Sequence, residues 1–204
     1  MTLDRLVLWR HGETEYNAVG RIQGHLDSVL TSTGHEQARR AAPLVAGFRP
    51  DVVLSSDLQR ASATAEAFAE VSGPSVRLDK RLRETHLGEW QGLNGAEVEH
   101  GWPGAMGNWR AKPTWAPPGG ESRVEVAERA REVVEELDLT HSGTALLCTH
   151  GGLITGLTAR LLDWPTSLWP GLGGVSNCHW AVLARRSDGD QRWRLMTYNG
   201  GVPE

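Results

Sequence analysis

The sequence has few of the features that define secreted, membrane-bound or nucleic-acid-binding proteins. Its two cysteines, Cys148 and Cys178, are too few to form a disulfide framework. The apolar run after residues 1–5 is far too short for a signal peptide or a membrane span. No run of lysine and arginine occurs, and the formal net charge is −4, so a nucleic-acid groove or an anionic membrane surface is not expected. We therefore expect a cytoplasmic protein that binds neither nucleic acid nor membranes.

Aromatic residues are unevenly represented, because only two tyrosines and two phenylalanines accompany nine tryptophans. Tryptophans usually pack in a core or under a lid rather than stack on a ligand. With 204 residues and 39% hydrophobic content, the chain can build one core without metal or disulfide support. We expect a single domain over residues 1–204.

Short apolar runs alternate with segments in which apolar residues recur at helical spacing. Ser122 and Glu125 have the spacing of a capping box, which indicates a helix start. The alternation predicts an α/β fold: a three-layer sandwich with a mostly parallel central sheet, helices on both faces and a C-terminal hairpin around residues 187–190. The predicted strands are residues 6–9, 52–55, 75–78, 144–148, 180–184 and 193–197, and the predicted helices are 33–48, 58–71, 122–139 and one ending at 162. The buried side of the 122–139 helix is expected to contain Val124, Ala127, Val134 and Leu137.

Residues 81–120 interrupt this alternation. The segment is rich in glycine, proline and tryptophan, and it is longer than an ordinary connection between two elements. Inserts of this kind are commonly lids or binding loops. We expect an irregular, lid-like segment.

Polar residues follow the predicted strands where these strands end. Residues 10–12 (Arg-His-Gly) follow the first strand, residues 150–152 (His-Gly-Gly) follow the strand at 144–148, and Arg60 begins the helix after a third strand. Ligands of open α/β sheets bind beyond the carboxyl ends of the strands, so these groups should meet in one crevice. Arginine forks, nearby glycine N–H groups and helix N-termini all favour phosphate. The sequence therefore predicts a phosphate pocket.

The remaining histidines carry no comparable signal. A single histidine is most often structural or exposed, which is what we expect of His25, His35, His100, His141 and His179. The spacing of histidine and cysteine does not match a zinc site.

Four motifs, in order along the chain, resemble the histidine phosphatase superfamily, also called phosphoglycerate mutase-like. They are residues 8–17 (LWRHGETEYN), 55–61 (SSDLQRA), 82–84 (LRE) and 149–152 (THGG). The resemblance implies that His11 accepts the phosphoryl group and that Glu84 donates a proton. It further implies that the phosphate-binding residues are Arg10, Asn17, Gln23, Arg60, His150 and Gly151.

These implied roles agree with elementary chemistry. A neutral imidazole can attack phosphorus, which divides one difficult hydrolysis into two transfers. A carboxyl group can protonate the leaving oxygen and then activate water. Arginines can stabilise the charge that many enzymes balance with Mg²⁺, so neither a metal nor another cofactor is expected.

The residues after Glu84 lack the Tyr-Gly step and the extra basic residues that family mutases carry, which favours a phosphatase. Residues 83–92, 114–123, 169–174 and 192–195 resemble a family subgroup whose substrate would be a small phosphorylated sugar or carboxylate such as glucosyl-3-phosphoglycerate. In that case Arg123 or the glycines at 119–120 would bind the carboxylate, and Trp90 or Trp115 would stack on the sugar. A cofactor-dependent mutase and a non-catalytic phospho-ligand binder are the alternatives. A nucleotide-binding oxidoreductase is poorly supported, because the glycines at 171–174 do not follow a predicted strand. The oligomeric state stays open, with a homodimer as one arrangement.

Overall fold

A computed structural model describes residues 2–72, 74–185 and 192–203. Its centre is a six-stranded sheet in the order β3-β2-β4-β1-β5-β6. The first four strands in this order are parallel, β5 runs antiparallel to β1, and the edge strand β6 runs antiparallel to β5. The strands are β1 (Leu3–Arg10), β2 (Val52–Ser55), β3 (Val76–Leu78), β4 (Gly143–Thr149), β5 (Trp180–Arg185) and β6 (Trp193–Gly200).

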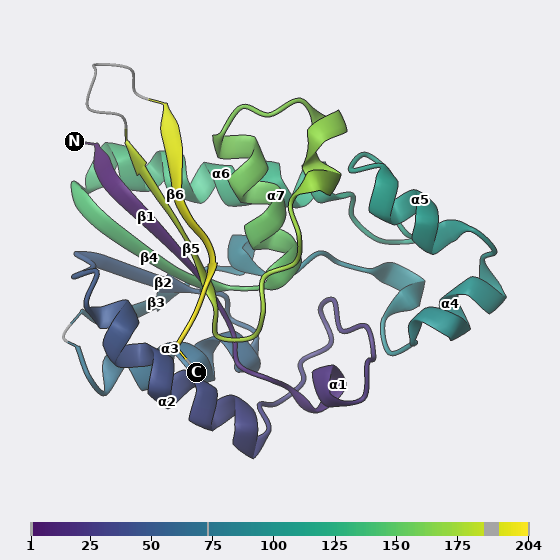
Figure 1. Ribbon diagram of the computed structural model, residues 1–204, viewed down its shortest axis with the longest axis horizontal. Coiled ribbons are helices and arrows are strands. Elements are labelled where there is room, and N and C mark those ends of the chain that lie inside the picture. The colour runs from purple at the N-terminus through teal and green to yellow at the C-terminus, as the bar shows by residue number, and fades with distance from the viewer. Residues whose placement is uncertain (1, 73, 186–191, 204) are drawn as a thin grey trace.

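Helices cover both faces of this sheet, so the predicted three-layer α/β fold is confirmed. One face carries α2 (Ser32–Ala46) and α3 (Gln59–Ala69), and the other carries α6 (Arg123–Thr140) and α7 (Gly151–Leu161) (Figure 1). Strand β1 shows why both layers are needed, because its successive side chains point to opposite faces. Leu6 and Leu8 pack with α6 and α7, whereas Val7 and Trp9 pack with α2 and α3.

The predicted elements are all present, with shifted ends. Strand β1 begins at Leu3, three residues before the predicted run. The prediction began too late because two charged, exposed residues of the strand precede its continuous buried stretch. The capping box is confirmed: Ser122 Oγ accepts from the N–H of Glu125, whose carboxylate accepts from the N–H of Ser122. Val124 is only partly buried, but it packs against the buried cluster of Ala127, Ala159 and Trp169, so its predicted place on the buried side of α6 is confirmed. The turn predicted at 187–190 lies outside the described residues. The buried apolar residues of α6 are Val126, Ala127, Ala130, Val133, Val134 and Leu137.

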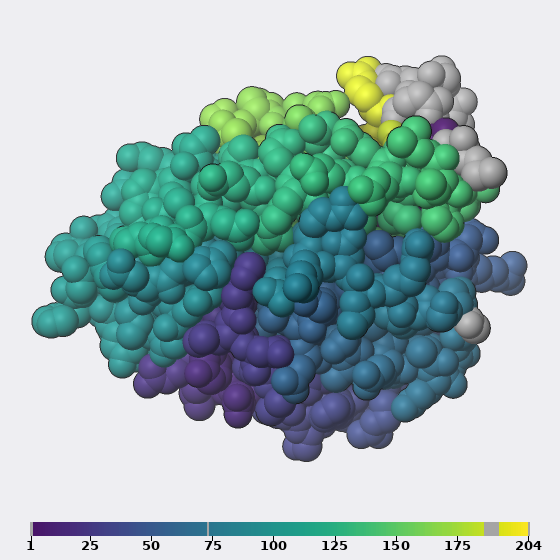
Figure 2. Space-filling view, turned by 180° about the vertical axis from the view of Figure 1, so that it is seen from behind, coloured from purple at the N-terminus to yellow at the C-terminus, as the bar shows by residue number. Residues whose placement is uncertain are grey.

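The segment at 81–120 was expected to be irregular, but it contains short helices. They are the 3-10 turns η1 (Lys80–Leu82) and η2 (Gly88–Trp90) and the helices α4 (Gly95–Gly101) and α5 (Ala105–Ala111). This segment projects from one end of the sheet (Figure 1). Seen from behind, its teal atoms lie against the purple residues near the start of the chain (Figure 2), where Arg21 pairs with Glu97.

The tryptophans of the projection form its own small core. Trp90 is 1% exposed, and its ring lies 5.5 Å from that of Trp115 and 6.2 Å from that of Trp109, measured between centroids. Trp90 therefore packs and does not face a ligand. Two further elements complete the fold, α1 (Glu15–Ala18) and η3 (Thr166–Gly171). No helix in the described part of the chain is long and apolar enough to cross a membrane.

Candidate active site

The polar loops after β1 and β4 meet at the carboxyl ends of these neighbouring strands. Arg10 pairs in register with Thr149, and the N–H of His11 donates to the carbonyl of Thr149 at 3.0 Å. The rings of His11 and His150 are 5.1 Å apart between centroids. Strand pairing thus brings together two histidines that are far apart in the sequence.

His11 is oriented by its own loop. Its Nδ1 lies 2.7 Å from the carbonyl oxygen of Gly12, which can only accept, so Nδ1 carries the proton and Nε2 has the lone pair. The side chain is buried, and this burial, together with the charges of Arg60 and Arg10, lowers the pKa of His11 well below its ordinary value. The imidazole is therefore neutral near pH 7, which is the nucleophilic form.

Arg60 and His150 form a second fixed pair. Arg60 Nε donates to Nδ1 of His150 at 3.2 Å, and its two terminal nitrogens donate to the carbonyls of Leu26 and Gly24. Nε2 of His150 then carries the proton, 2.9 Å from Oγ of Ser56. Burial lowers the pKa of Arg60 to about 10, so the guanidinium stays charged near neutral pH.

Arg10 has a buried hydrogen-bond donor, Nε, that is not used within the described residues. Its Nη1 donates to the carbonyl of Val175 at 2.6 Å, but its buried Nε has no hydrogen-bond partner among the described residues. Buried N–H groups are rarely left without an acceptor. An anion beside His11 would supply that acceptor.

Glu84 reaches the same place from the segment after β3. Its carboxylate accepts from the N–H groups of Gly152 at 3.0 Å, of Leu153 at 3.1 Å and of Thr85 at 2.8 Å. A Cβ on Gly152 would lie 2.6 Å from Oε1 of Glu84, so any other residue there would push the carboxylate out of this position. A Cβ on Gly151 would lie 3.3 Å from Nε of Arg10, which is a tight contact that a small shift of the arginine would relieve.

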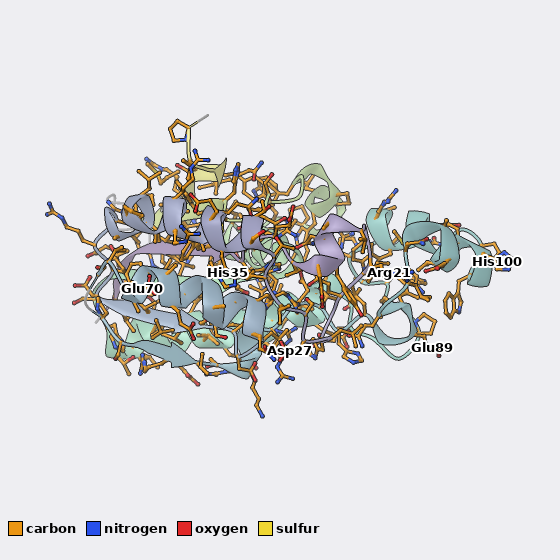
Figure 3. The ribbon with its side chains drawn as sticks, turned by 90° about the horizontal axis from the view of Figure 1, so that it is seen from below. Arg21, Asp27, His35, Glu70, Glu89 and His100 are labelled. Atoms are coloured by element: carbon orange, nitrogen blue, oxygen red, sulfur yellow. The ribbon has the colours of Figure 1, made fainter. Side chains whose placement is uncertain are left out.

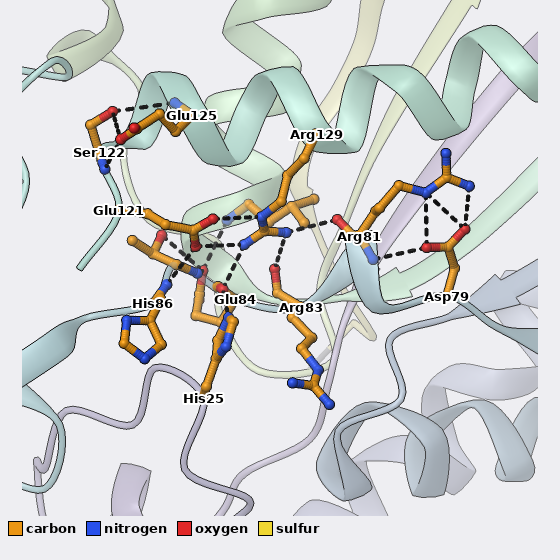
Figure 4. A network of polar contacts seen from close by, with 12 residues as sticks. His25, Asp79, Arg81, Arg83, Glu84, His86, Glu121, Ser122, Glu125 and Arg129 are labelled. Atoms are coloured by element: carbon orange, nitrogen blue, oxygen red, sulfur yellow. Dashed lines mark hydrogen bonds and ion pairs between the residues drawn. The ribbon is translucent and has the colours of Figure 1, made fainter. Parts of the chain in front are cut away.

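The backbone around Glu84 is held by charged side chains (Figure 4). Arg129, on α6, donates to the carbonyls of Arg81, Arg83 and Glu84 and pairs with Glu121. His25 Nε2 donates to the carbonyl of Glu84 at 2.8 Å. Together these groups fix the position of Glu84.

Asn17 and Gln23 brace the loop that carries His11. Asn17 is the third residue of α1, completes a capping box with Thr14, and accepts from Nδ2 of Asn177 at 3.2 Å. Gln23 is buried and accepts from the hydroxyl groups of Thr14 and Ser28. The Nδ2 of Asn177 also donates to the carbonyl of His11, so Asn17 is connected to His11 through Asn177, and Gln23 is connected to Asn17 through the hydroxyl of Thr14.

A cavity of about 330 Å³ opens beside these groups. Arg10, Glu84 and Gly151 line it, together with Arg123. Trp109 is the tryptophan that lines this cavity, which differs from the predicted Trp90 or Trp115. The further lining residues are Gly152, Thr155, Leu172, Gly174 and Val175.

The sequence did not single out several residues that support the site. Ser56 lies within the motif at residues 55–61, which could have indicated its place in the site. Asn177 lies in a loop and Arg129 in a helix, and neither belongs to a motif. His25, which we expect to be structural or exposed, has a structural role, because its Nε2 donates to the backbone carbonyl of Glu84. As expected, His35 and His100 are exposed, His35 on α2 and His100 at the outer end of the projection (Figure 3). In the same view, Asp27 lies near the start of α3, where it accepts a hydrogen bond from the N–H of Gln59.

The charge of the site comes from arginine. Within residues 2–72, 74–185 and 192–203, no group of three or more histidine, cysteine or acidic residues is arranged to hold a metal ion. Arg10 and Arg60 instead place two guanidinium groups beside two neutral histidines.

Comparison with known proteins supports a family assignment. A model of the histidine phosphatase superfamily (branch 1) matches residues 6–200. The chain is 49% identical to the glucosyl-3-phosphoglycerate phosphatase of Mycolicibacterium vanbaalenii, over 99% of this chain and 97% of that protein. It is 37% identical to a metal-independent phosphoserine phosphatase of Arabidopsis thaliana, over 95% of this chain and 80% of that protein. The structure of a mycobacterial glucosyl-3-phosphoglycerate phosphatase complexed with VO3 is 46% identical, with a TM-score of 0.93 over 97% of this chain and all of that one. The chain therefore belongs to the histidine phosphatase superfamily.

Proposed function

We propose that the protein is a phosphomonoester phosphatase that works through a phosphohistidine at His11. The observation that carries the proposal is the neutral, oriented imidazole of His11 between Arg10 and Arg60, with the carboxylate of Glu84 lining the adjoining cavity. The arginines and His150 would bind the phosphoryl oxygens. They would stabilise the charge that develops there during transfer.

The reaction would proceed in two transfers. In the first, Nε2 of His11 forms a bond to phosphorus, the ester P–O bond breaks, and protonated Glu84 gives its proton to the leaving oxygen. In the second, the Glu84 carboxylate takes a proton from water, the water oxygen bonds to phosphorus, and the P–N bond breaks. Inorganic phosphate leaves and His11 is restored.

The proposed substrate is glucosyl-3-phosphoglycerate or a similar small phosphorylated sugar or carboxylate. Its support is the identity of 49% over nearly the full length to a phosphatase named for that substrate. The main competitor is a mutase, which must retain the phosphorylated histidine against water and rebind the product. The sequence after Glu84 has no additional arginine or lysine until Arg110 and Lys112.

Further proposals follow from the sequence and the family. The chain forms one domain with residues 81–120 as a lid over the cavity, it needs no metal, and it acts in the cytoplasm without nucleic-acid partners. A homodimer is the assembly to test, by light scattering at several concentrations.

One assay tests phosphatase against mutase. The protein is incubated with 3-phosphoglycerate and 2,3-bisphosphoglycerate while both phosphate release and 2-phosphoglycerate are followed. The proposal expects phosphate release, with glucosyl-3-phosphoglycerate as the preferred substrate in a panel of phosphosugars and phosphoamino acids. Rapid isomerisation with negligible phosphate would overturn it, and equal rates across the panel would reject the named substrate alone.

A further inference from the structure

Arg123 lies at the first position of α6 and lines the same cavity as Arg10 and Glu84. The cavity of about 330 Å³ therefore extends from the phosphate pocket to a further cationic side chain. Its volume is at the lower end of the range for small-molecule sites. A compact ligand in this cavity could therefore contact both the phosphate pocket and Arg123.

The ion pairs of the molecule set Arg123 apart from most other arginines. Arginines that are not solvent-exposed pair with a carboxylate throughout the described residues, except for Arg10, Arg60 and Arg123. Arg10 and Arg60 belong to the proposed phosphate pocket, where an anionic ligand takes the place of an internal carboxylate. Arg123 likewise has no carboxylate partner among the described residues, but it lies outside that pocket. The arginines with carboxylate partners are Arg81, Arg83, Arg129, Arg131, Arg160 and Arg185.

Arg123 is also held in a fixed orientation. Its Nη2 donates to the carbonyls of Trp109 at 2.7 Å and Arg110 at 2.8 Å, and its Cζ lies 5.7 Å from the ring centroid of Trp109. Its Nε is buried without a hydrogen-bond partner in the described chain, and burial lowers the pKa of the guanidinium. Taking a cation out of water is costly unless an anion compensates it. A fixed, partly dehydrated arginine in a cavity is thus ready for a carboxylate.

We infer that Arg123 binds the carboxylate of a phosphorylated carboxylic acid whose phosphate lies at Arg10 and Arg60. The inference rests on the proposed phosphatase function and names what distinguishes its substrates. The phosphate end has Arg10, Arg60 and His150 for a dianion, whereas Arg123 offers a single cation, which matches one carboxylate. Arg123 does not contact the reacting atoms, so its effect is on specificity.

The test compares two substrates that differ only in the carboxylate. 3-Phosphoglycerate carries a carboxylate where glycerol 3-phosphate carries a CH₂OH group. The measured quantity is the ratio of kcat/KM for the first to kcat/KM for the second. In Arg123→Gln we expect this ratio to fall about 10- to 100-fold, the usual range for losing a charge-assisted hydrogen bond. Arg123→Lys, which keeps the charge, should lose less.

Arg110→Gln is the matched control, because Arg110 is exposed on the neighbouring helix and the same charge is removed. Its ratio should stay within about 2-fold of the wild type. An Arg123→Gln variant that loses activity equally on both substrates would reveal a merely structural role and overturn the inference. A fall of the ratio in Arg110→Gln instead would assign the carboxylate to Arg110 and also overturn it.

A binding measurement separates this inference from the phosphatase proposal. Calorimetric titration of the unphosphorylated protein with 3-phosphoglycerate and with glycerol 3-phosphate needs no turnover. If no phosphate is released from any substrate but the wild type binds 3-phosphoglycerate more tightly and Arg123→Gln does not, the subsite stands and the phosphatase proposal fails. Equal affinities for both ligands in the wild type would reject the subsite.

Discussion

Glu84 accepts a hydrogen bond from the backbone N–H of Gly152 at 3.0 Å, so the candidate proton donor is anchored to the first turn of α7. This helix begins directly after His150. The same helix start therefore positions both His150 and Glu84. The N–H groups of such a turn are natural partners for a carboxylate.

Replacement of Glu84 tests its role through the leaving group. Glu84→Gln keeps the shape but cannot transfer the proton, so kcat on alkyl phosphates should fall by about 10²- to 10⁴-fold. With p-nitrophenyl phosphate the loss should be much smaller, because nitrophenolate leaves with little help. Single-turnover phosphorylation rates measure both. An equal loss on the two substrates would assign proton transfer to another group.

The covalent intermediate is expected on Nε2 of His11, because its Nδ1 is engaged with the carbonyl of Gly12. Rapid quenching with a ³²P-labelled substrate should trap an acid-labile, alkali-stable label that maps to His11. His11→Ala should lose activity on the order of 10³-fold or more while keeping its circular dichroism spectrum. Label on serine, aspartate or cysteine would refute the mechanism.

The two buried histidines should make stability depend on pH in a defined direction. Burial lowers the pKa of both His11 and His150, whereas in the unfolded chain each has its ordinary pKa of about 6.5. As the pH falls below about 6.5, the unfolded chain takes up protons that the folded chain does not, so the free energy of unfolding decreases. Each histidine contributes at most about 1.4 kcal/mol per pH unit. Urea unfolding between pH 7.5 and 5.5 should show this loss, and His11→Asn should show a shallower one. A slope identical to that of the wild type would contradict it.

The layers of the fold and the residues of the pocket could be predicted from the sequence for a physical reason. Parallel strands end at one edge, so polar residues such as His11 and His150 that directly follow buried strands must meet there. The supports of Glu84 could not be predicted in this way. Arg129 is one of several charged residues on α6, and only the packing of that helix determines which of them faces the segment at 81–84. The place of Trp109 could not be predicted for a similar reason. The sequence does not distinguish among the nine tryptophans, and only the packing of the projection around Trp90 determines which of them lines the cavity.

Activity should not require a divalent metal. Arg10, Arg60 and His150 would supply the charge stabilisation at the phosphoryl oxygens. Turnover in excess EDTA should equal turnover in Mg²⁺, within about 20% assay error, while vanadate and inorganic phosphate should inhibit competitively. Loss of activity in EDTA with recovery on adding Mg²⁺ or Mn²⁺ would refute the expectation.

Arg129 provides the sharpest test of how Glu84 is positioned. Its guanidinium donates to three backbone carbonyls of the segment at 81–84, those of Arg81 at 2.7 Å, Arg83 at 2.8 Å and Glu84 at 2.8 Å, and it pairs with Glu121. Arg129→Gln removes this donor from all three carbonyls and, within the described residues, leaves them only the hydrogen bond from His25 to the carbonyl of Glu84, so the segment gains freedom to move. A displacement of a catalytic group by about 1 Å can cost about 10²-fold in rate.

We therefore expect Arg129→Gln to reproduce, more weakly, the leaving-group signature of Glu84→Gln. Its kcat should fall about 10- to 100-fold on alkyl phosphates and only a few-fold on p-nitrophenyl phosphate. Arg131→Gln is the matched control, because Arg131 lies on the same helix and, within the described part of the chain, its ion pairs are with Glu128 and Glu135. Its rates should equal those of the wild type. A general loss of folding would lower the kcat of Arg129→Gln equally on both substrates. A thermal melting curve identifies that case. A folded Arg129→Gln variant with equal losses on both substrates would mean that Arg129 does not act through Glu84.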